Sequence, residues 1–175
     1  KKYFGKNTAL SKELQLYNSL IKESLKSEAQ AFVDKYKLPK NRQNAQITLI
    51  VSGMGSENMF NATKNVVTNM SNSDTIINVG ICGGDKKFAI GELIDAREEN
   101  LTCVESEISG HGQYELVDME SNGFLKAAQD VENKYIFKVV SDHFEPHEVT
   151  KEKTKSLIFN VIDDINKIIF HKGNN

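Results

Sequence analysis

The chain has 175 residues, of which 39% are hydrophobic, so residues 1–175 are expected to form a single domain with a real apolar core. Its 24 acidic and 22 basic residues give a net charge of -2, which offers no basic surface for nucleic acid or for an anionic membrane. The two cysteines, Cys82 and Cys103, lack metal-ligand spacing, and no apolar run approaches a membrane span or a signal-peptide core. We therefore expect a cytoplasmic protein with no metal, no cofactor, no nucleic-acid partner and no membrane segment.

The first predicted element is a long helix over residues 11–36. Its apolar residues recur in steps of three and four, as on one helix face: Leu14, Tyr17, Ile21, Leu25, Ala29, Phe32, Val33 and Tyr36. Ser11 is a suitable amino-terminal cap, and Leu38 with Pro39 ends the helix. Residues 1–40 are thus expected to form a helical amino-terminal segment.

A predicted βαβ unit follows a polar loop. Residues 47–51 read ITLIV, which predicts a buried strand, and the following SGMG predicts a turn. A helix capped by Ser56 is then indicated by apolar residues at helical spacing, namely Met59, Ala62, Val66 and Met70. A second strand over residues 76–79 completes the unit, and the two strands are expected to be parallel.

Residues 74–95, DTIINVGICGGDKKFAIGELID, are the central stretch of the chain. Ile76, Ile77 and Val79 predict a strand that is buried on both faces. The strand is expected to end in a glycine turn formed by Gly80, Gly83 and Gly84. Bare amides in such a turn can bind an oxyanion or a sugar hydroxyl, although three glycines can also serve only to make the turn tight.

The remaining elements continue the alternation of strands and helices. Residues 88–94 predict a short strand with a turn or bulge at Gly91, residues 96–113 are polar without a clear period, and residues 114–117 are extended. A helix begins near residues 118–121, a last strand covers residues 135–140, and a closing helix covers residues 149–170. Buried strands that alternate with amphipathic helices indicate an α/β sandwich with a mostly parallel sheet.

Two carboxylates have the placement expected of a nucleoside-cleaving pair. Asp142 follows the last strand, and Glu120 opens a helix, while ligands of open α/β sheets collect at the carboxyl ends of strands. One ionised carboxylate can bind the ribose hydroxyls, and a second with a raised pKa can protonate the departing base. Each residue also has a structural explanation, because Glu120 can favour a helix start and Asp142 can simply begin a loop.

Four ordered strings decide between these interpretations: VSGMGSENMFNATKNVV, INVGICGGDKKFAIGELID, VDMESNGFLKAA and FKVVSDHFEP. Together they resemble the nucleoside phosphorylase and nucleosidase superfamily, which includes the methylthioadenosine/S-adenosylhomocysteine nucleosidases, over about residues 47–146. The resemblance implies a phosphorylase/hydrolase-like three-layer α/β/α sandwich with a mostly parallel mixed sheet. It also implies cleavage of the N-glycosidic bond of a purine nucleoside, by water or by phosphate.

The resemblance also implies roles for individual residues. Glu120 corresponds to the ribose-binding glutamate, Met119 to the residue beneath the sugar, and Asp142 to the aspartate that protonates the purine. Three further groups follow from matched positions: Ser141 before that aspartate, Met54 beside the ribose, and Gly53, Gly80 and Gly83 in the turns near the phosphate or attacking water.

The chain departs from the family pattern in three places. The glutamate that positions the nucleophilic water is matched by Glu28 or by Glu13, with Glu28 the better match, or by neither. Ile81 stands where many members have a hydroxyl residue, and isoleucine offers no hydrogen bond. The segment 95–118 is short, and only His111 and Tyr114 remain there as replacements for the residues that hold the base. The base pocket is then either missing or completed by a partner subunit, which favours a homodimer.

Three functions follow from these observations. The leading one is a nucleosidase rather than a phosphorylase, because no arginine occurs in the central turn or near Gly53 to clamp phosphate. Arg97 is the only candidate for that role at a strand end. The alternative is a degenerate, non-catalytic member that binds a nucleoside or nucleotide. A dinucleotide-binding domain is the third, but Asn58 replaces the last glycine of that fingerprint.

Overall fold

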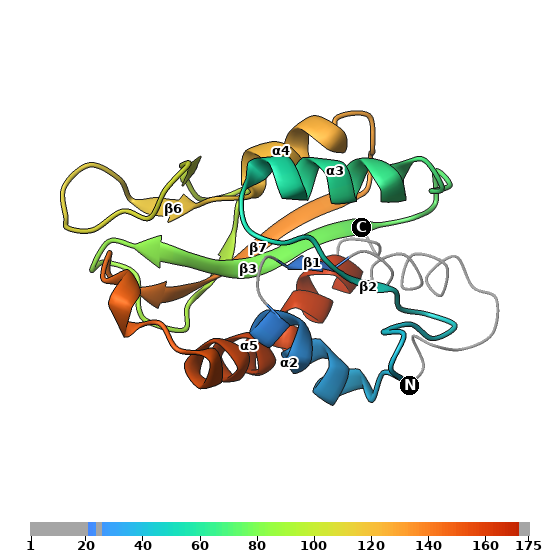
Figure 1. The fold of residues 1–175 in the computed structure, drawn as a ribbon, viewed down its shortest axis with the longest axis horizontal. Coiled ribbons are helices and arrows are strands. Elements are labelled where there is room, and N and C mark those ends of the chain that lie inside the picture. The colour runs from blue at the N-terminus through green and yellow to red at the C-terminus, as the bar shows by residue number, and fades with distance from the viewer. Residues whose placement is uncertain (1–20, 24–25, 172–175) are drawn as a thin grey trace.

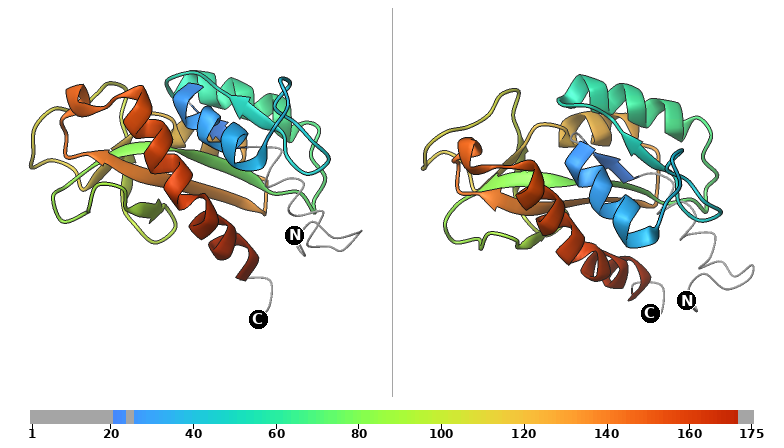
Figure 2. Two further views of the ribbon diagram at one scale, coloured as in Figure 1. Left: turned by 90° about the horizontal axis from the view of Figure 1, so that it is seen from below. Right: turned by 60° about the horizontal axis from the view of Figure 1, so that its bottom comes forward.

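The computed structural model describes residues 21–23 and 26–171 (Figure 1). Among these residues the helices lie on both faces of one sheet, with α3 and α4 on one side and α2 and α5 on the other (Figures 1 and 2). This arrangement confirms the predicted three-layer α/β/α sandwich. In chain order the elements are β1 (Ile21–Glu23), α2 (Lys26–Tyr36), β2 (Leu49–Val51), α3 (Ser56–Val67), β3 (Ile76–Gly84), β4 (Leu93–Asp95), β5 (Leu101–Cys103), β6 (Leu116–Asp118), α4 (Ser121–Ala127), β7 (Lys134–Asp142), the 3-10 helix η2 (Pro146–Glu148) and α5 (Lys151–His171).

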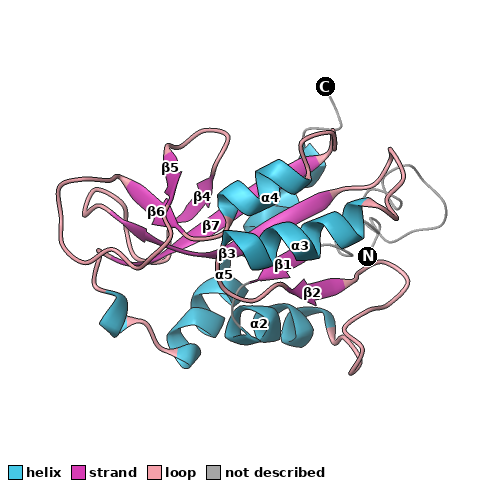
Figure 3. Cartoon of the chain, turned by 45° about the horizontal axis from the view of Figure 1, so that its top comes forward, coloured by secondary structure: helices cyan, strands magenta, loops and turns pink. Residues whose placement is uncertain are grey.

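The sheet is organised around β3, as Figure 3 shows. Strand β7 runs parallel to β3 along its length, and on the other edge β1 pairs in parallel with Ile77 and Asn78. Further along that edge β6 pairs antiparallel with Gly83 and Gly84. The outer pairs are parallel β1–β2, parallel β5–β6 and antiparallel β4–β7, so the described sheet is mixed and mostly parallel, as predicted.

In the part of the chain that the structure describes, the edge of β3 is open between β1 and β6. Among the described residues, positions 79–82 have no strand partner on this edge. The backbone N–H of Ile81 instead donates to the carboxylate of Glu28, at 2.8 Å. A side chain from α2 therefore completes the sheet at this opening, which is where the candidate site lies.

Two apolar layers fix the helices to the sheet. Beneath the sheet, Phe32 of α2 and Ile162 of α5 are fully buried and belong to the same core cluster as Phe137 of β7. Above it, Met59 of α3 and Phe124 of α4 form a second cluster with sheet residues. Burial of apolar side chains on both faces gives the sandwich most of its stability.

The predicted long amino-terminal helix is wrong over residues 21–23, which form strand β1. Helix α2 begins only at Lys26, and residues 11–20, with Ser11 and Glu13, lie outside the described part. Strand β1 pairs with β2 on one side and with β3 on the other, and these backbone hydrogen bonds stabilise the extended conformation. The periodicity of the local sequence does not contain this information, because the pairing is with distant parts of the chain. Because β1 lies between β2 and β3, the two strands of the predicted βαβ unit are not neighbours.

The predicted glycine turn is also wrong, because Gly80, Gly83 and Gly84 lie inside strand β3. A Cβ at Gly83 would lie 3.2 Å from Val117, and one at Gly84 would lie 3.1 Å from Val140. These distances are shorter than ordinary van der Waals contact. The glycines therefore allow close approach of neighbouring side chains to the strand, and they are not needed for a turn.

Several shorter features also differ from the expectation. Residue Gly55 occupies the cap position of α3, whereas Ser56 is the first helical residue and donates its hydroxyl to the Met119 carbonyl, at 3.2 Å. The predicted strand 88–94 is confined to β4, and its first part is a turn in which Gly91 has φ 90. Strand β5 lies in the stretch expected to be irregular.

Candidate functional site

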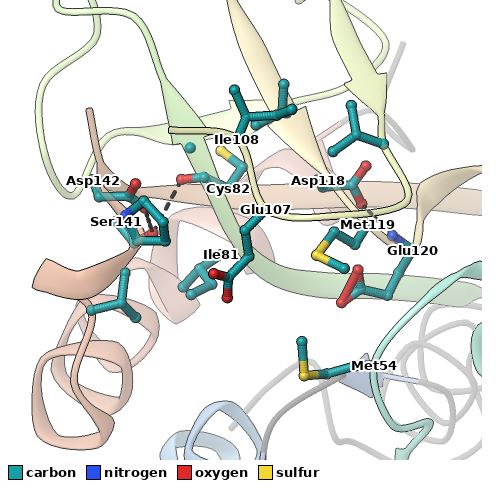
Figure 4. Close-up of a pocket in the computed structure, with 15 residues that line it drawn as sticks. Met54, Ile81, Cys82, Glu107, Ile108, Asp118, Met119, Glu120, Ser141 and Asp142 are labelled. Atoms are coloured by element: carbon teal, nitrogen blue, oxygen red, sulfur yellow. Dashed lines mark hydrogen bonds between the residues drawn. The ribbon is translucent and has the colours of Figure 1, made fainter. Parts of the chain in front are cut away.

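A cavity of about 220 Å³ opens beside β3 and the carboxyl end of β7 (Figure 4). Strand β6 runs antiparallel to β3, so the chain that leaves β6 passes the opening in the edge of β3. The cavity is lined by Met54, Ile81, Cys82, Gly83, Val104, Glu107, Ile108, Val117, Asp118, Met119, Glu120, Ser141, Asp142, Pro146 and Val149. Glu120 and Asp142 thus share one cavity, as the carboxylate pair requires.

Glu120 is held by the turn between β6 and α4. The carboxylate of Asp118 accepts hydrogen bonds from the backbone N–H of Glu120, at 3.2 Å, and of Ser121, at 2.8 Å. It also accepts one from the Ser121 hydroxyl. The side chain of Glu120 is 7% exposed and faces the cavity, so Asp118 acts as the scaffold that presents it (Figure 4).

Lys138 of β7 supplies the counter-charge for this turn. Its Nζ lies 3.1 Å from Asp118 Oδ2 and 3.3 Å from Asn78 Oδ1, and the residue is buried. Burial alone would lower the pKa of Lys138, but the carboxylates of Asp118, Glu120 and Glu28 outweigh it and raise that pKa above its ordinary value. The ammonium therefore stays charged and balances a set of acidic groups.

Glu28 enters from α2 and is fully buried. Its Oε1 accepts the N–H of Ile81, and a Cβ at Gly80 would lie 3.2 Å from both Glu28 Oε1 and Lys138 Nζ. Glycine at position 80 thus leaves room for two charged groups against the strand. Glu28 does not line the cavity, but its hydrogen-bond partner Ile81 does.

Asp142 ends β7 and is held through both carboxylate oxygens. The Ser141 hydroxyl lies 2.6 Å from Asp142 Oδ1 and 3.2 Å from the Cys82 carbonyl, and the N–H of Glu145 donates to Asp142 Oδ2 at 2.8 Å. The Ser141 hydroxyl and the Glu145 N–H therefore fix the orientation of the Asp142 carboxyl group at the cavity wall.

The predicted site residues fall into two groups. Those that share the cavity wall are Met54, Gly83, Met119, Glu120, Ser141 and Asp142. Glu28 and Gly80 lie directly behind the wall, at the opening of β3. Gly53 also lies off the wall, in the turn before α3, where its φ of 85 suits glycine.

No family model and no curated protein matches the sequence. Solved structures do match. The 5′-methylthioadenosine nucleosidase of Arabidopsis thaliana is 17% identical, with a TM-score of 0.59 over 84% of this chain and 95% of that one. The MTAN of Chlamydia trachomatis is 18% identical, with a TM-score of 0.63 over 86% and 98%. This chain has the nucleosidase fold.

A third nucleosidase structure has a ligand. The 5′-methylthioadenosine/S-adenosylhomocysteine nucleosidase of Neisseria meningitidis, in complex with methylthio-immucillin-A, is 13% identical with a TM-score of 0.60. The match covers 83% of this chain and 98% of that one. The nucleosidase fold thus extends over most of the chain and confirms the fold implied by the sequence resemblance.

Within this nucleosidase fold, the short connection between β5 and β6 contributes residues that the sequence did not indicate. Val104, Glu107 and Ile108 line the cavity, although their segment has no periodic pattern. His111, expected as a possible base-holding residue, packs edge-on against Phe144 with ring centroids 6.0 Å apart, and does not line the cavity. Tyr114 also lies off the wall.

Two further observations concern the described part of the chain. Potential metal ligands come together in one exposed group of the described residues, Glu145, His147 and Glu148, and exposed acidic groups are common without an ion. The helices of the described part are all too short or too polar to cross a membrane.

Proposed function

We propose that this chain cleaves the N-glycosidic bond of a purine nucleoside, of the methylthioadenosine/S-adenosylhomocysteine type, with water as the nucleophile. The observation that carries the proposal is that Glu120 and Asp142 line one cavity from two different elements. Likeness in fold to proteins named as nucleosidases supports the same reaction.

Each carboxylate has a separate role in this proposal. Glu120, presented by Asp118, accepts hydrogen bonds from the ribose hydroxyls, with Met119 and Met54 beside the sugar. Asp142 gives a proton to the departing base, which takes the electron pair of the broken C–N bond. The oxygen of water then bonds to the anomeric carbon, and the water releases a proton to the solvent, from which Asp142 is protonated again. The products are a free base and a free sugar.

Water is favoured over phosphate by the charge of the cavity wall. Among the described residues, no lysine, arginine or histidine lines the cavity, and the nearby Lys138 is engaged by Asp118. A phosphate dianion would instead face the carboxylates of Glu107 and Glu120. Like charges at short range oppose binding, so the wall supports a nucleosidase rather than a phosphorylase.

For Glu28 we propose the role of positioning the water, with Gly80 leaving it the necessary space. The carboxylate lies behind Ile81, at the opening of β3, and it touches the cavity wall through the Ile81 N–H. Glu28 itself does not line the cavity, whereas Ile81, whose side chain offers no hydrogen bond, does. The position of Glu28 off the cavity wall is the observation that favours the second candidate function, a protein that binds a nucleoside without turnover.

Release of free base separates the two candidates. Purified protein is incubated with methylthioadenosine, S-adenosylhomocysteine, adenosine and inosine, with and without phosphate, and adenine or hypoxanthine is quantified by chromatography. Base release that is independent of phosphate is the expected result. Thermal stabilisation by a nucleoside without any base release would support binding only, and release that requires phosphate would contradict water as the nucleophile.

Two further properties complete the proposal. We expect the chain to act in the cytoplasm and to form a homodimer, in which a partner subunit completes the base pocket next to the short connection between β5 and β6. Sedimentation equilibrium of the full chain tests the dimer, and a monomer at micromolar concentration would contradict it.

A further inference from the structure

The cavity wall holds one carboxylate that the proposed reaction does not use. Asp118 is paired with Lys138, Glu120 is assigned to the sugar, and Asp142 is assigned to the base. Glu107 is the remaining acidic residue of the wall. It comes from the connection between β5 and β6.

Glu107 lies on an exposed part of the cavity wall. In Figure 4 its side chain projects toward Ile81, into the space between Asp142 on one side and Glu120 on the other. No hydrogen bond or ion pair joins the Glu107 carboxylate to another of the described residues. Its charge is therefore not neutralised within the described part of the chain.

We propose that Glu107 complements positive charge on the sugar of a bound nucleoside, and so makes the cavity selective for a cationic sugar over a neutral one. The inference rests on the proposed function. If Glu120 binds the ribose and Asp142 meets the base, the bond between sugar and base lies between them, where Glu107 points. When that bond breaks, positive charge develops on the sugar, and a carboxylate nearby stabilises that charge more than it stabilises the neutral substrate.

The size of the effect follows from the exposure of Glu107. The residue is exposed, so its attraction for a cation is screened nearly as in bulk water. A unit charge about 4 Å away then changes an equilibrium constant by about fivefold. This factor applies to a cationic ligand and vanishes for a neutral ligand of the same shape.

The test compares Glu107→Gln with Glu105→Gln. Glu105 is an exposed acid of the same connection that does not line the cavity, so its loss changes the net charge equally. Calorimetry measures the dissociation constants of two ligands for each variant and for the wild type. One is a neutral purine nucleoside analogue whose base is joined to the sugar by a C–C bond, which hydrolysis cannot cleave, and the other is the same analogue with a protonated nitrogen in the sugar ring.

The expected result is a preference for the cationic analogue that falls about fivefold in Glu107→Gln and stays unchanged in Glu105→Gln. Equal loss in both variants, or no loss in either, would overturn the assignment. Binding is measured without turnover, so a wild type that binds with the expected preference but releases no base would refute the proposed hydrolysis and leave Glu107 supported. If the wild type releases base but Glu107→Gln binds both ligands as the wild type does, the role of Glu107 is refuted and the proposed hydrolysis is supported. If the wild type binds neither ligand, both proposals are overturned.

Discussion

Replacing Lys138 with methionine should lower the free energy of unfolding by about 3 kcal/mol. The side chains of Lys138 and Asp118 are 3% and 1% exposed, so the substitution leaves a carboxylate that water cannot reach. Removal of one partner from a buried ion pair costs about 3–5 kcal/mol. Asp118 keeps its hydrogen bonds from the Glu120 and Ser121 amides, which places the expected cost at the lower end of that range.

Equilibrium unfolding in urea, followed by circular dichroism, measures this loss. With a slope of about 2 kcal/mol per molar urea, the midpoint should fall by about 1.5 M. The matched control is Lys87→Met, which removes a pair with Glu115 whose side chains are 53% and 49% exposed and should cost less than about 1 kcal/mol. A Lys138→Met midpoint equal to that of the control would refute the reasoning. Adding Asp118→Asn should recover part of the loss, because the unpaired charge disappears.

Three other outcomes follow from the described contacts. The folded-state pKa of Lys138 is raised above its ordinary value of 10.5, so the charged side chain contributes fully to stability below pH 10.5 and loses that contribution as the pH rises through the folded-state pKa. The difference in unfolding free energy between the wild type and Lys138→Met should therefore become smaller in strong alkali. A difference that becomes larger would contradict this prediction. In Gly123→Ala the added Cβ would lie 2.0 Å from a carbonyl oxygen of α3, so thermal unfolding should show a loss of about 2 kcal/mol, against about 0.5 kcal/mol or less for the exposed neighbour Asn122→Ala. Burial raises the pKa of the Cys82 thiol, so an alkylating reagent at pH 8 should modify Cys103 first, and early labelling of Cys82 in peptide mapping would be the contrary result.

The elements predicted correctly are those whose sequence carries a long periodic or continuous apolar pattern. Helices α3 and α5 were expected near their observed bounds because their apolar residues repeat at helical spacing, and β7 was expected because most of it is a continuous apolar run. The short strand β2 was also expected, because it ends the apolar run ITLIV. The three-residue strands β1, β4 and β5 lie in no such run and are too short to show a period. Their extended backbone depends on hydrogen bonds to strands far away in the sequence.

Site residues divide along a similar line. Glu120 and Asp142 could be placed together from the sequence, because both stand at the ends of elements that reach one edge of an α/β sheet. Glu107 could not, because its position depends on how an aperiodic connection folds over the cavity. Lys138 lies within an apolar strand, so the sequence did not indicate a role for it. Its role follows from the tertiary structure, in which β7 pairs with β3 and the Lys138 ammonium lies next to Asp118.

The glycines of the central stretch show how a motif can be noticed for the wrong reason. Gly80, Gly83 and Gly84 were expected to form a turn, yet they belong to a strand. At Gly80 the missing side chain leaves room for Glu28 and Lys138 against the strand. Close approach of charged groups to a backbone depends on the tertiary structure, so the local sequence cannot distinguish it from a turn.

The most direct test of whether both acids act on one bound nucleoside is the rate of base release. It is measured for Glu120→Gln, for Asp142→Asn and for the wild type under identical conditions. Loss of a general acid should lower kcat by about 100-fold or more in Asp142→Asn. Loss of ribose binding should lower kcat/KM by a similar factor in Glu120→Gln, while circular dichroism shows both variants folded. Wild-type rates of base release in either folded variant would contradict the account.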